Sequence, residues 1–263
     1  MKKYLLMIIG FIMVFTITAC SYSGEAADNE SESDTASDTT SDEAESDNSA
    51  TLPNEYTISD FPVIYQMPEL PTGCEITALT MVLNYYGYQA DKVEMATEYL
   101  PTLESEETYY GEDGSLYGND INQYFIGDPT GIGTICGTGA IVTAADSYLN
   151  DNGSAMTAVD RTGAALEEVY QLVSEGIPVV VWVTIEMEER IPTEGWYTES
   201  GEYVDWATND HGAVLIGYTQ KTVLIADPIS GLVEYDSEQF EKVFVSRSNQ
   251  CVVLLQETSK RKP

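Results

Sequence analysis

Thiol chemistry is suggested by Cys74, which stands directly before Glu75 in the stretch Pro-Thr-Gly-Cys-Glu. Thr72 and Glu75 have the Ser/Thr-x-x-Glu spacing of a helix capping box, so we expect Cys74 in the first turn of a helix. Unpaired backbone N–H groups and the helix dipole favour an anion there, and a thiolate is an anion. We therefore expect Cys74 to be an unusually acidic thiol and a candidate nucleophile. The competing interpretation is a small buried helix residue, which is common for free cysteine.

The chain's single histidine, His211, is the candidate base for that thiol. It stands just before the apolar run 213–218, where we expect it to be accessible and held rigidly by a strand. Asp227 ends the next predicted strand, so a hairpin would bring its carboxylate beside His211 to orient the imidazole. Gln66 is the candidate oxyanion donor, acting together with the backbone N–H of Cys74. Taken singly, a loop histidine and a turn aspartate before proline are ordinary features.

The elements that must position these residues follow from the apolar spacing. Helices are predicted at about 74–86, 91–100, 140–149 and 164–174, and strands at 178–185, 213–218, 222–226 and 251–255. A helical first half followed by a strand-rich second half favours an α+β fold. Residues 104–139 are expected to form long surface loops. Their acidic stretches are interpreted as a solvated face, with preference for a basic substrate or a cation as alternatives.

The start of the chain has the form of an export signal. Lys2 and Lys3 precede an apolar stretch, and the small pair Thr18-Ala19 stands directly before Cys20, which resembles the lipobox of bacterial lipoproteins. Cys20 would then be acylated and would hold the protein to the outer face of the bacterial cell membrane. The alternative is an uncleaved transmembrane anchor, although the apolar run is shorter than the ~20 residues that a spanning helix needs. Either interpretation places the rest of the chain outside the cytoplasm.

The remaining chain divides into a tether and one domain. Residues 21–52 contain ten Asp or Glu, eight Ser and no Lys or Arg, so they are expected to be a disordered, extended spacer. Residues 53–263 fit a single domain of ordinary size, with nine Lys or Arg against 34 Asp or Glu. Such an acidic domain argues against nucleic acid as a partner, because phosphate binding depends on clustered basic residues.

Cysteine usage gives two further expectations. Once Cys20 is assigned to lipid, Cys74, Cys136 and Cys251 remain, and an odd number leaves at least one thiol free. Their spacing does not suit zinc and there is one histidine, so we expect neither a metal nor a cofactor. Cys136 and Cys251 do not stand at a capped helix start, so we expect both to be dispensable for catalysis.

Several motifs resemble, in order, those of the family-thirty-nine-like cysteine peptidases, relatives of the bacteriocin-processing peptidases. They are residues 65–87, 176–184, 210–218 and 226–231, and the resemblance covers about residues 60–255. It implies a papain-like fold with the nucleophile helix packed on an antiparallel sheet. It also implies Cys74 as nucleophile, His211 as base, Asp227 as orienting residue and Gln66 in the oxyanion hole. The sequence shows neither a multi-span region nor a Walker loop, unlike the transporter-linked members, so cleavage after a double glycine is not assumed.

The expected function is therefore an extracytoplasmic, lipid-anchored cysteine peptidase that hydrolyses peptide bonds in a peptide or protein substrate. We expect it to be a monomer. Two alternatives remain open. The same triad would also serve a cell-wall peptide amidase or an acyl transferase, and a papain-like shell without turnover would be a binding module.

Overall fold

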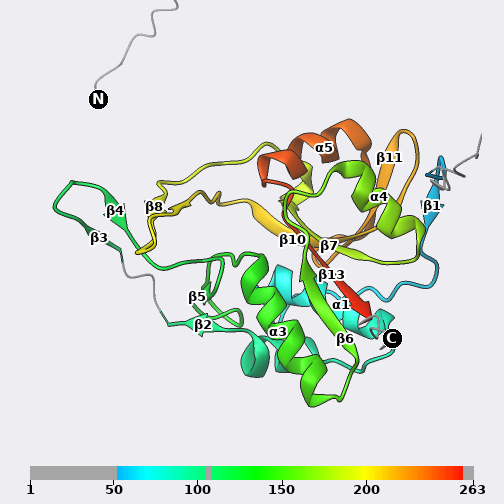
Figure 1. Ribbon diagram of the computed structural model, residues 1–263, viewed down its shortest axis with the longest axis horizontal. Helices are drawn as coiled ribbons and strands as arrows, with labels where there is room; N and C mark the ends of the chain where they lie inside the picture. Colours follow the sequence, from blue (N-terminus) through cyan, green and yellow to red (C-terminus); the bar gives the residue numbers. More distant parts are fainter. Residues whose placement is uncertain (1–51, 105–107, 257–263) are drawn as a thin grey trace, which may run out of the picture. The chain divides into compact units, whose positions relative to one another are not determined.

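The computed structural model describes residues 52–104 and 108–256 (Figure 1). Cys20, the expected signal peptide and residues 21–51 of the expected tether lie outside the described residues. Within the described ranges, no helix combines the length and the apolar character needed to cross a membrane.

A seven-stranded antiparallel sheet forms the centre of the domain. Its order is β12 (Gly231–Asp236), β11 (Thr222–Asp227), β10 (Asp210–Tyr218), β7 (Val179–Thr184), β13 (Cys251–Gln256) and β6 (Met156–Asp160), and β1 (Tyr56–Thr57) also pairs with β10. Strands β7 and β10 are buried along their whole length. The nine-residue strand β10 therefore gives any residue it carries a fixed position in the core.

Helices cover both faces of this sheet (Figure 1). In that view α1 (Cys74–Tyr85) and α3 (Thr138–Asp151) lie below it, and α4 (Leu166–Ser174) and α5 (Ser237–Ser246) lie above it. Helix α1 packs against β10 and β7, and its residues from Cys74 to Leu83 are all buried. Because α1 is buried on all sides over these residues, it is a central helix rather than a surface one.

Shorter elements connect these layers. Asp91 caps α2 (Lys92–Glu94) by accepting hydrogen bonds from two backbone N–H groups, and the π-helix η1 (Met95–Tyr99) follows directly. Strands β2 (Thr102–Leu103) and β5 (Phe125–Ile126) form a parallel pair. A four-stranded sheet combines β3 (Tyr109–Tyr110), β4 (Leu116–Tyr117), β8 (Trp196–Tyr197) and β9 (Tyr203–Val204). A turn of 3-10 helix, η2 (Ile185–Met187), follows β7.

The predicted α+β class is confirmed, and every predicted helix and strand has a counterpart within a few residues. Three of the larger elements, β6, β12 and α5, were not predicted. The expectation of long loops over 104–139 was wrong in part, because this segment holds β3, β4, β5 and the start of α3. Strands of two residues are too short to leave a periodic pattern in the sequence.

Candidate active site

Cys74 is the first residue of α1, as expected, but the cap of this helix differs from the predicted one. The N-cap residue is Gly73, and it has no side-chain cap. The hydroxyl of Thr72 instead donates to the backbone carbonyl of Asp128, 3.3 Å away. The predicted capping box of Thr72 and Glu75 was therefore wrong, although Cys74 still stands among the unpaired N–H groups of a helix start.

The thiol of Cys74 is buried and hydrogen-bonded. It donates to Oε2 of Glu75 at 3.2 Å, and the backbone N–H of Gly212 lies near enough to the sulfur to favour a negative charge there. Burial, followed by the Glu75 carboxylate, raises the pKa of Cys74 well above its ordinary value, against the opposing effect of the Gly212 N–H. The expectation of an unusually acidic thiol was therefore wrong for this arrangement.

Glu75 is a buried carboxyl group whose place in the site was not predicted. It is 1% exposed, and its Oε1 has no hydrogen-bond partner within the described part of the chain. Burial raises the pKa of Glu75 to about 7, although backbone N–H groups, including that of Cys136, and the Cys74 thiol favour its ionised form. The sequence did hold a signal, because Glu75 is the single charged residue of α1. A carboxyl beside the candidate nucleophile thus changes charge near neutral pH.

Gly212 allows β10 to approach the start of α1 closely. A Cβ atom at this position would lie 2.7 Å from Cα of Glu75 and 3.0 Å from its backbone nitrogen. Only glycine avoids this clash with the helix backbone. The residue that follows His211 is therefore in direct contact with the residue that follows Cys74.

His211 lies inside β10, opposite Val183 of β7, and is 1% exposed. The expectation of an accessible residue ahead of the strand was wrong, because the ladder begins at Asp210, earlier than the apolar run. Its ring nitrogen Nε2 lies 3.1 Å from Oδ2 of Asp227. This pair brings together the two residues that were expected to meet across the β10–β11 hairpin.

Asp227 ends β11 and is held from both sides. Its Oδ1 accepts hydrogen bonds from the backbone N–H groups of Ile229 and Ser230, and its Oδ2 faces His211. Burial opposes ionisation, but these hydrogen bonds and the imidazole outweigh it and lower the pKa of Asp227. An ionised Asp227 that accepts a hydrogen bond from Nε2–H of His211 leaves Nδ1 unprotonated and able to take a proton from a thiol.

Gln66 is buried between the segment that follows Asp227 and the segment that precedes Cys74. Its backbone N–H donates to the carbonyl of Pro228, which follows Asp227, and its side-chain Nε2 donates to the carbonyl of Pro71 at 3.1 Å. A side-chain amide has two N–H groups, so a second donor remains beyond the bond to Pro71. The geometry is thus compatible with an oxyanion donor, with one of the two hydrogens already used to fix the amide.

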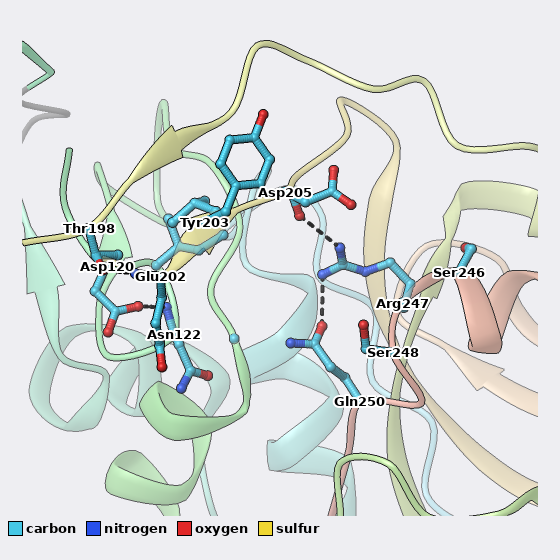
Figure 2. Close-up of a pocket in the computed structure, with 13 residues that line it drawn as sticks. Asp120, Asn122, Thr198, Glu202, Tyr203, Asp205, Ser246, Arg247, Ser248 and Gln250 are labelled. Carbon is cyan, nitrogen blue, oxygen red and sulfur yellow. Dashed lines mark hydrogen bonds between the residues drawn. The ribbon is translucent and has the colours of Figure 1, made fainter. Parts of the chain in front are cut away.

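Asp210 is a further residue that the sequence did not single out. Arg190 donates to both of its carboxylate oxygens, at 3.0 and 3.1 Å, and Nη1 of Arg247 lies 2.9 Å from Oδ2. Figure 2 shows Arg247 at the side of a surface cavity of about 190 Å³. This cavity is not lined by Cys74, His211 or Asp227, so it is separate from the candidate active site. Arg247, which lines this cavity, nevertheless forms an ion pair with Asp210, the residue before His211.

Metal and disulfide chemistry receive no support from the described ranges. Among these residues, no group of three or more His, Cys, Asp or Glu is arranged to hold a metal ion. Cys74, Cys136 and Cys251 are all buried and unpaired. Trp182 donates through Nε1 to the carbonyl of Cys136, which fixes the loop before α3 against β7.

Comparisons with known proteins agree on the family. The Peptidase_C39 like family matches residues 58–252. The uncharacterised protein YvpB of Bacillus subtilis (strain 168) is 32% identical over 189 residues, which span 71% of this chain and 70% of YvpB. The crystal structure of a candidate C39-like peptidase from Bacillus anthracis has a TM-score of 0.66 at 31% identity, covering 78% of this chain and 99% of the other. The cysteine protease xylellain from Xylella fastidiosa is more distant, with a TM-score of 0.41, 12% identity and coverage of 78% and 87% of the two chains.

The matched region includes α1, β7, β10 and β11, the elements that carry or support the candidate site residues. It extends over well more than half of the chain, and the expected family resemblance is confirmed. The C39-like fold is confirmed as well, by the structure from Bacillus anthracis. The chain therefore belongs to the Peptidase_C39 like family.

Proposed function

We propose that this protein is a cysteine peptidase that hydrolyses peptide bonds with Cys74, His211 and Asp227 as its triad. The observation that carries the proposal is the buried His211–Asp227 pair, joined at 3.1 Å, on a strand that contacts the helix start where Cys74 stands. A thiol at a helix start and an imidazole oriented by a carboxylate are the parts that thiol-dependent acyl transfer needs. Membership of a peptidase family supports the same reaction.

In the proposed mechanism, Nδ1 of His211 accepts the thiol proton, and the thiolate attacks the carbonyl carbon of the scissile peptide bond. The oxyanion that forms accepts hydrogen bonds from the Cys74 backbone N–H and the Gln66 amide. The imidazolium then gives its proton to the leaving amine, which leaves an acyl group on the sulfur. Water, activated by the same imidazole, releases the acid and restores the thiol. The thiol must first leave its hydrogen bond to Glu75.

We also propose that the enzyme works outside the cytoplasm, held to the membrane by a lipid on Cys20. The support is the sequence alone, in which basic residues, an apolar stretch and small residues precede Cys20 in the order that export requires. The acidic segment that follows would keep the domain clear of the membrane surface.

The test is cleavage of a random peptide library by the full chain, with products identified by mass spectrometry. Cys74→Ala and His211→Ala should abolish cleavage, whereas Asp227→Asn should fold normally and lower kcat by roughly 10³- to 10⁴-fold. Reaction in ¹⁸O-labelled water distinguishes hydrolysis from acyl transfer, because only hydrolysis places the label in the new carboxyl group. Cleavage that survives Cys74→Ala would contradict the proposed nucleophile.

One observation favours a second candidate, a binding module without turnover. The thiol is buried, donates to Glu75 and has a raised pKa, which are properties of an unreactive cysteine. Iodoacetamide distinguishes the two candidates. An enzyme should be alkylated selectively at Cys74 and lose activity in proportion, whereas a binding module should resist alkylation until it unfolds.

A further inference from the structure

The four-stranded sheet formed by β3, β4, β8 and β9 carries a row of tyrosines. Tyr109 is opposite Tyr117, Tyr117 is opposite Tyr197, and Tyr197 is opposite Tyr203. Residues directly opposite each other on neighbouring strands lie on the same face of a sheet, so all four rings share one face. The centroids of neighbouring rings are 5.6, 6.2 and 5.1 Å apart along the row. We call these four residues the tyrosine row.

The tyrosine row faces solvent. Tyr109, Tyr197 and Tyr203 are 53%, 39% and 57% exposed. The neighbouring positions of β8 and β9 point to the opposite face, and there Trp196 and Val204 are buried. Strands β8 and β9 therefore rest on the domain through the face opposite the row, whereas on β3 that opposite face is open at Tyr110, which is 70% exposed. The four tyrosines form an aromatic strip on the other face. An exposed strip of this kind marks an interaction surface.

Carboxylates lie in the turns on the two sides of this strip. The β3–β4 turn carries Glu112 and Asp113, and the β8–β9 turn carries Glu199 and Glu202, all of them exposed. Because β4 and β8 run parallel, the turn before β4 and the turn after β8 lie at opposite ends of the strands, on either side of the row. The row is thus bracketed by two pairs of negative charges.

The sequence around the strip lacks compensating positive charge. No Lys or Arg occurs between Lys92 and Arg161, or between Arg190 and Lys221, and these two stretches hold all four strands. Two cavities adjoin the row, one beside Tyr109 and one beside Tyr203, and both include Asp120. Figure 2 shows Asp120 and Glu202 on one side of the second cavity and Arg247 on the other. That arginine is already paired with Asp210.

We propose that the tyrosine row and its flanking carboxylates dock an arginine- or lysine-bearing peptide segment. A cation gains attraction over an aromatic face within ~6 Å of the ring centroid. The four carboxylates add attraction for the same charge and repel an acidic segment. This docking site is separate from the proposed triad and does not depend on Cys74 being active.

Binding should be measured by fluorescence anisotropy with the full chain carrying Cys74→Ala, so that turnover cannot consume the probe. The probe is a labelled eight-residue peptide that alternates arginine and glycine. Its matched control replaces each arginine by citrulline, which has nearly the same shape without the charge. Residues 21–52 carry ten Asp or Glu and therefore also attract the arginine peptide. All variants share this segment, so the test compares the peptide affinity of each surface variant with that of the parent protein.

Tyr109→Leu/Tyr203→Leu should weaken binding of the arginine peptide by roughly four- to twenty-fivefold, because each lost ring contributes about two- to fivefold. Tyr109→Phe/Tyr203→Phe keeps the rings and should keep most of the affinity. Glu199→Gln/Glu202→Gln should weaken binding and reduce its dependence on salt. Tyr124→Leu, an exposed tyrosine outside the row, should have no effect. Tryptophan fluorescence, to which Trp196 on the buried face of β8 contributes together with Trp182 and Trp206, should match the wild type in each variant with an intact sheet.

Equal binding of the citrulline peptide, or wild-type affinity in a Tyr109→Leu/Tyr203→Leu protein with an intact sheet, would overturn the proposal. Binding of an N-acetylglucosamine hexamer instead of the arginine peptide would also overturn it, and would assign the row to glycans. The outcome is independent of the proposed reaction. If the protein docks the peptide but cleaves no library member, the docking site is supported and the proposed peptidase function is contradicted. If it cleaves library members but does not dock the peptide, the peptidase function is supported and the docking site is contradicted.

Discussion

Replacing Glu75 by glutamine tests whether this carboxyl group controls the Cys74 thiol. The substitution keeps the shape of the side chain and removes its charge. Sγ of Cys74 and Oε2 of Glu75 are 3.2 Å apart. Two unit charges ~4 Å apart interact by ~4 kcal/mol at an effective dielectric constant of ~20. Glu75→Gln should therefore lower the pKa of Cys74, because it removes a negative charge that opposes the thiolate.

The assay is the rate of iodoacetamide alkylation of Cys74 from pH 5 to pH 10, followed by intact mass. Because the pKa of Glu75 is about 7, the wild-type carboxylate suppresses the thiolate most strongly above neutral pH. The alkylation profile of Glu75→Gln should rise at least one pH unit below that of the wild type. Glu167→Gln, which removes an exposed carboxylate from the first turn of α4, is the matched control and should change nothing. Overlapping profiles for Glu75→Gln and wild type would refute the electrostatic reasoning, and so would an upward shift.

The same substitution has a predicted signature in stability. Burial raises the pKa of Glu75 from 4.5 to about 7, so the folded state binds more protons than the unfolded state in this range. Its contribution to stability is fully present below about pH 4.5 and is lost as the pH rises through about 7. The loss is on the order of 3 kcal/mol. Urea unfolding at pH 5 and pH 8 should show the wild type losing more stability across this window than Glu75→Gln.

Three further predictions concern the close contacts and the chain start. Gly212→Ala should lower the free energy of unfolding by roughly 1–3 kcal/mol in urea unfolding, because its Cβ would meet Cα of Glu75 at 2.7 Å. Cys136→Ser should fold and keep peptide cleavage, since Cys136 is not a proposed reacting group, and a folded but inactive variant would show that the assignment of a single nucleophile is wrong. The native protein should begin at a diacylated Cys20 in mass spectrometry, and an intact Met1 or an unmodified start downstream would exclude the lipid anchor.

What the sequence predicted well depended on local patterns. Helical spacing from Ile76 onwards located α1, and two short apolar runs separated by a turn located the β10–β11 hairpin. The hairpin alone requires residues near its open end to be neighbours, so the meeting of His211 and Asp227 was predictable without a tertiary fold. These relations extend over a few residues and are therefore visible in spacing.

What the sequence did not reveal depends on contacts between distant segments. The hydroxyl of Thr72 bonds to Asp128, 56 residues away, instead of capping α1. The local spacing of residues around Thr72 could not indicate that a distant carbonyl would take its hydroxyl hydrogen bond. Likewise the burial of Glu75 and the requirement for glycine at 212 arise only when β10 packs against the helix start. The raised pKa of Cys74 has the same tertiary origin, so the local argument from the helix dipole gave the wrong direction.

Two sets of contacts fix the position of His211. One is the buried ion cluster of Asp210, Arg190 and Arg247, which holds its backbone, and the other is Asp227, which holds its side chain. On the backbone side, Asp210 is 8% exposed and is fixed by Arg190 and Arg247. On the side-chain side, Asp227 fixes the ring. A buried ion cluster adds little net stability, because desolvation offsets the attraction, but removing one member leaves an uncompensated charge and is strongly unfavourable. The cluster therefore fixes the start of β10 in the domain. It thereby fixes the position of His211 relative to the start of α1, where Cys74 stands.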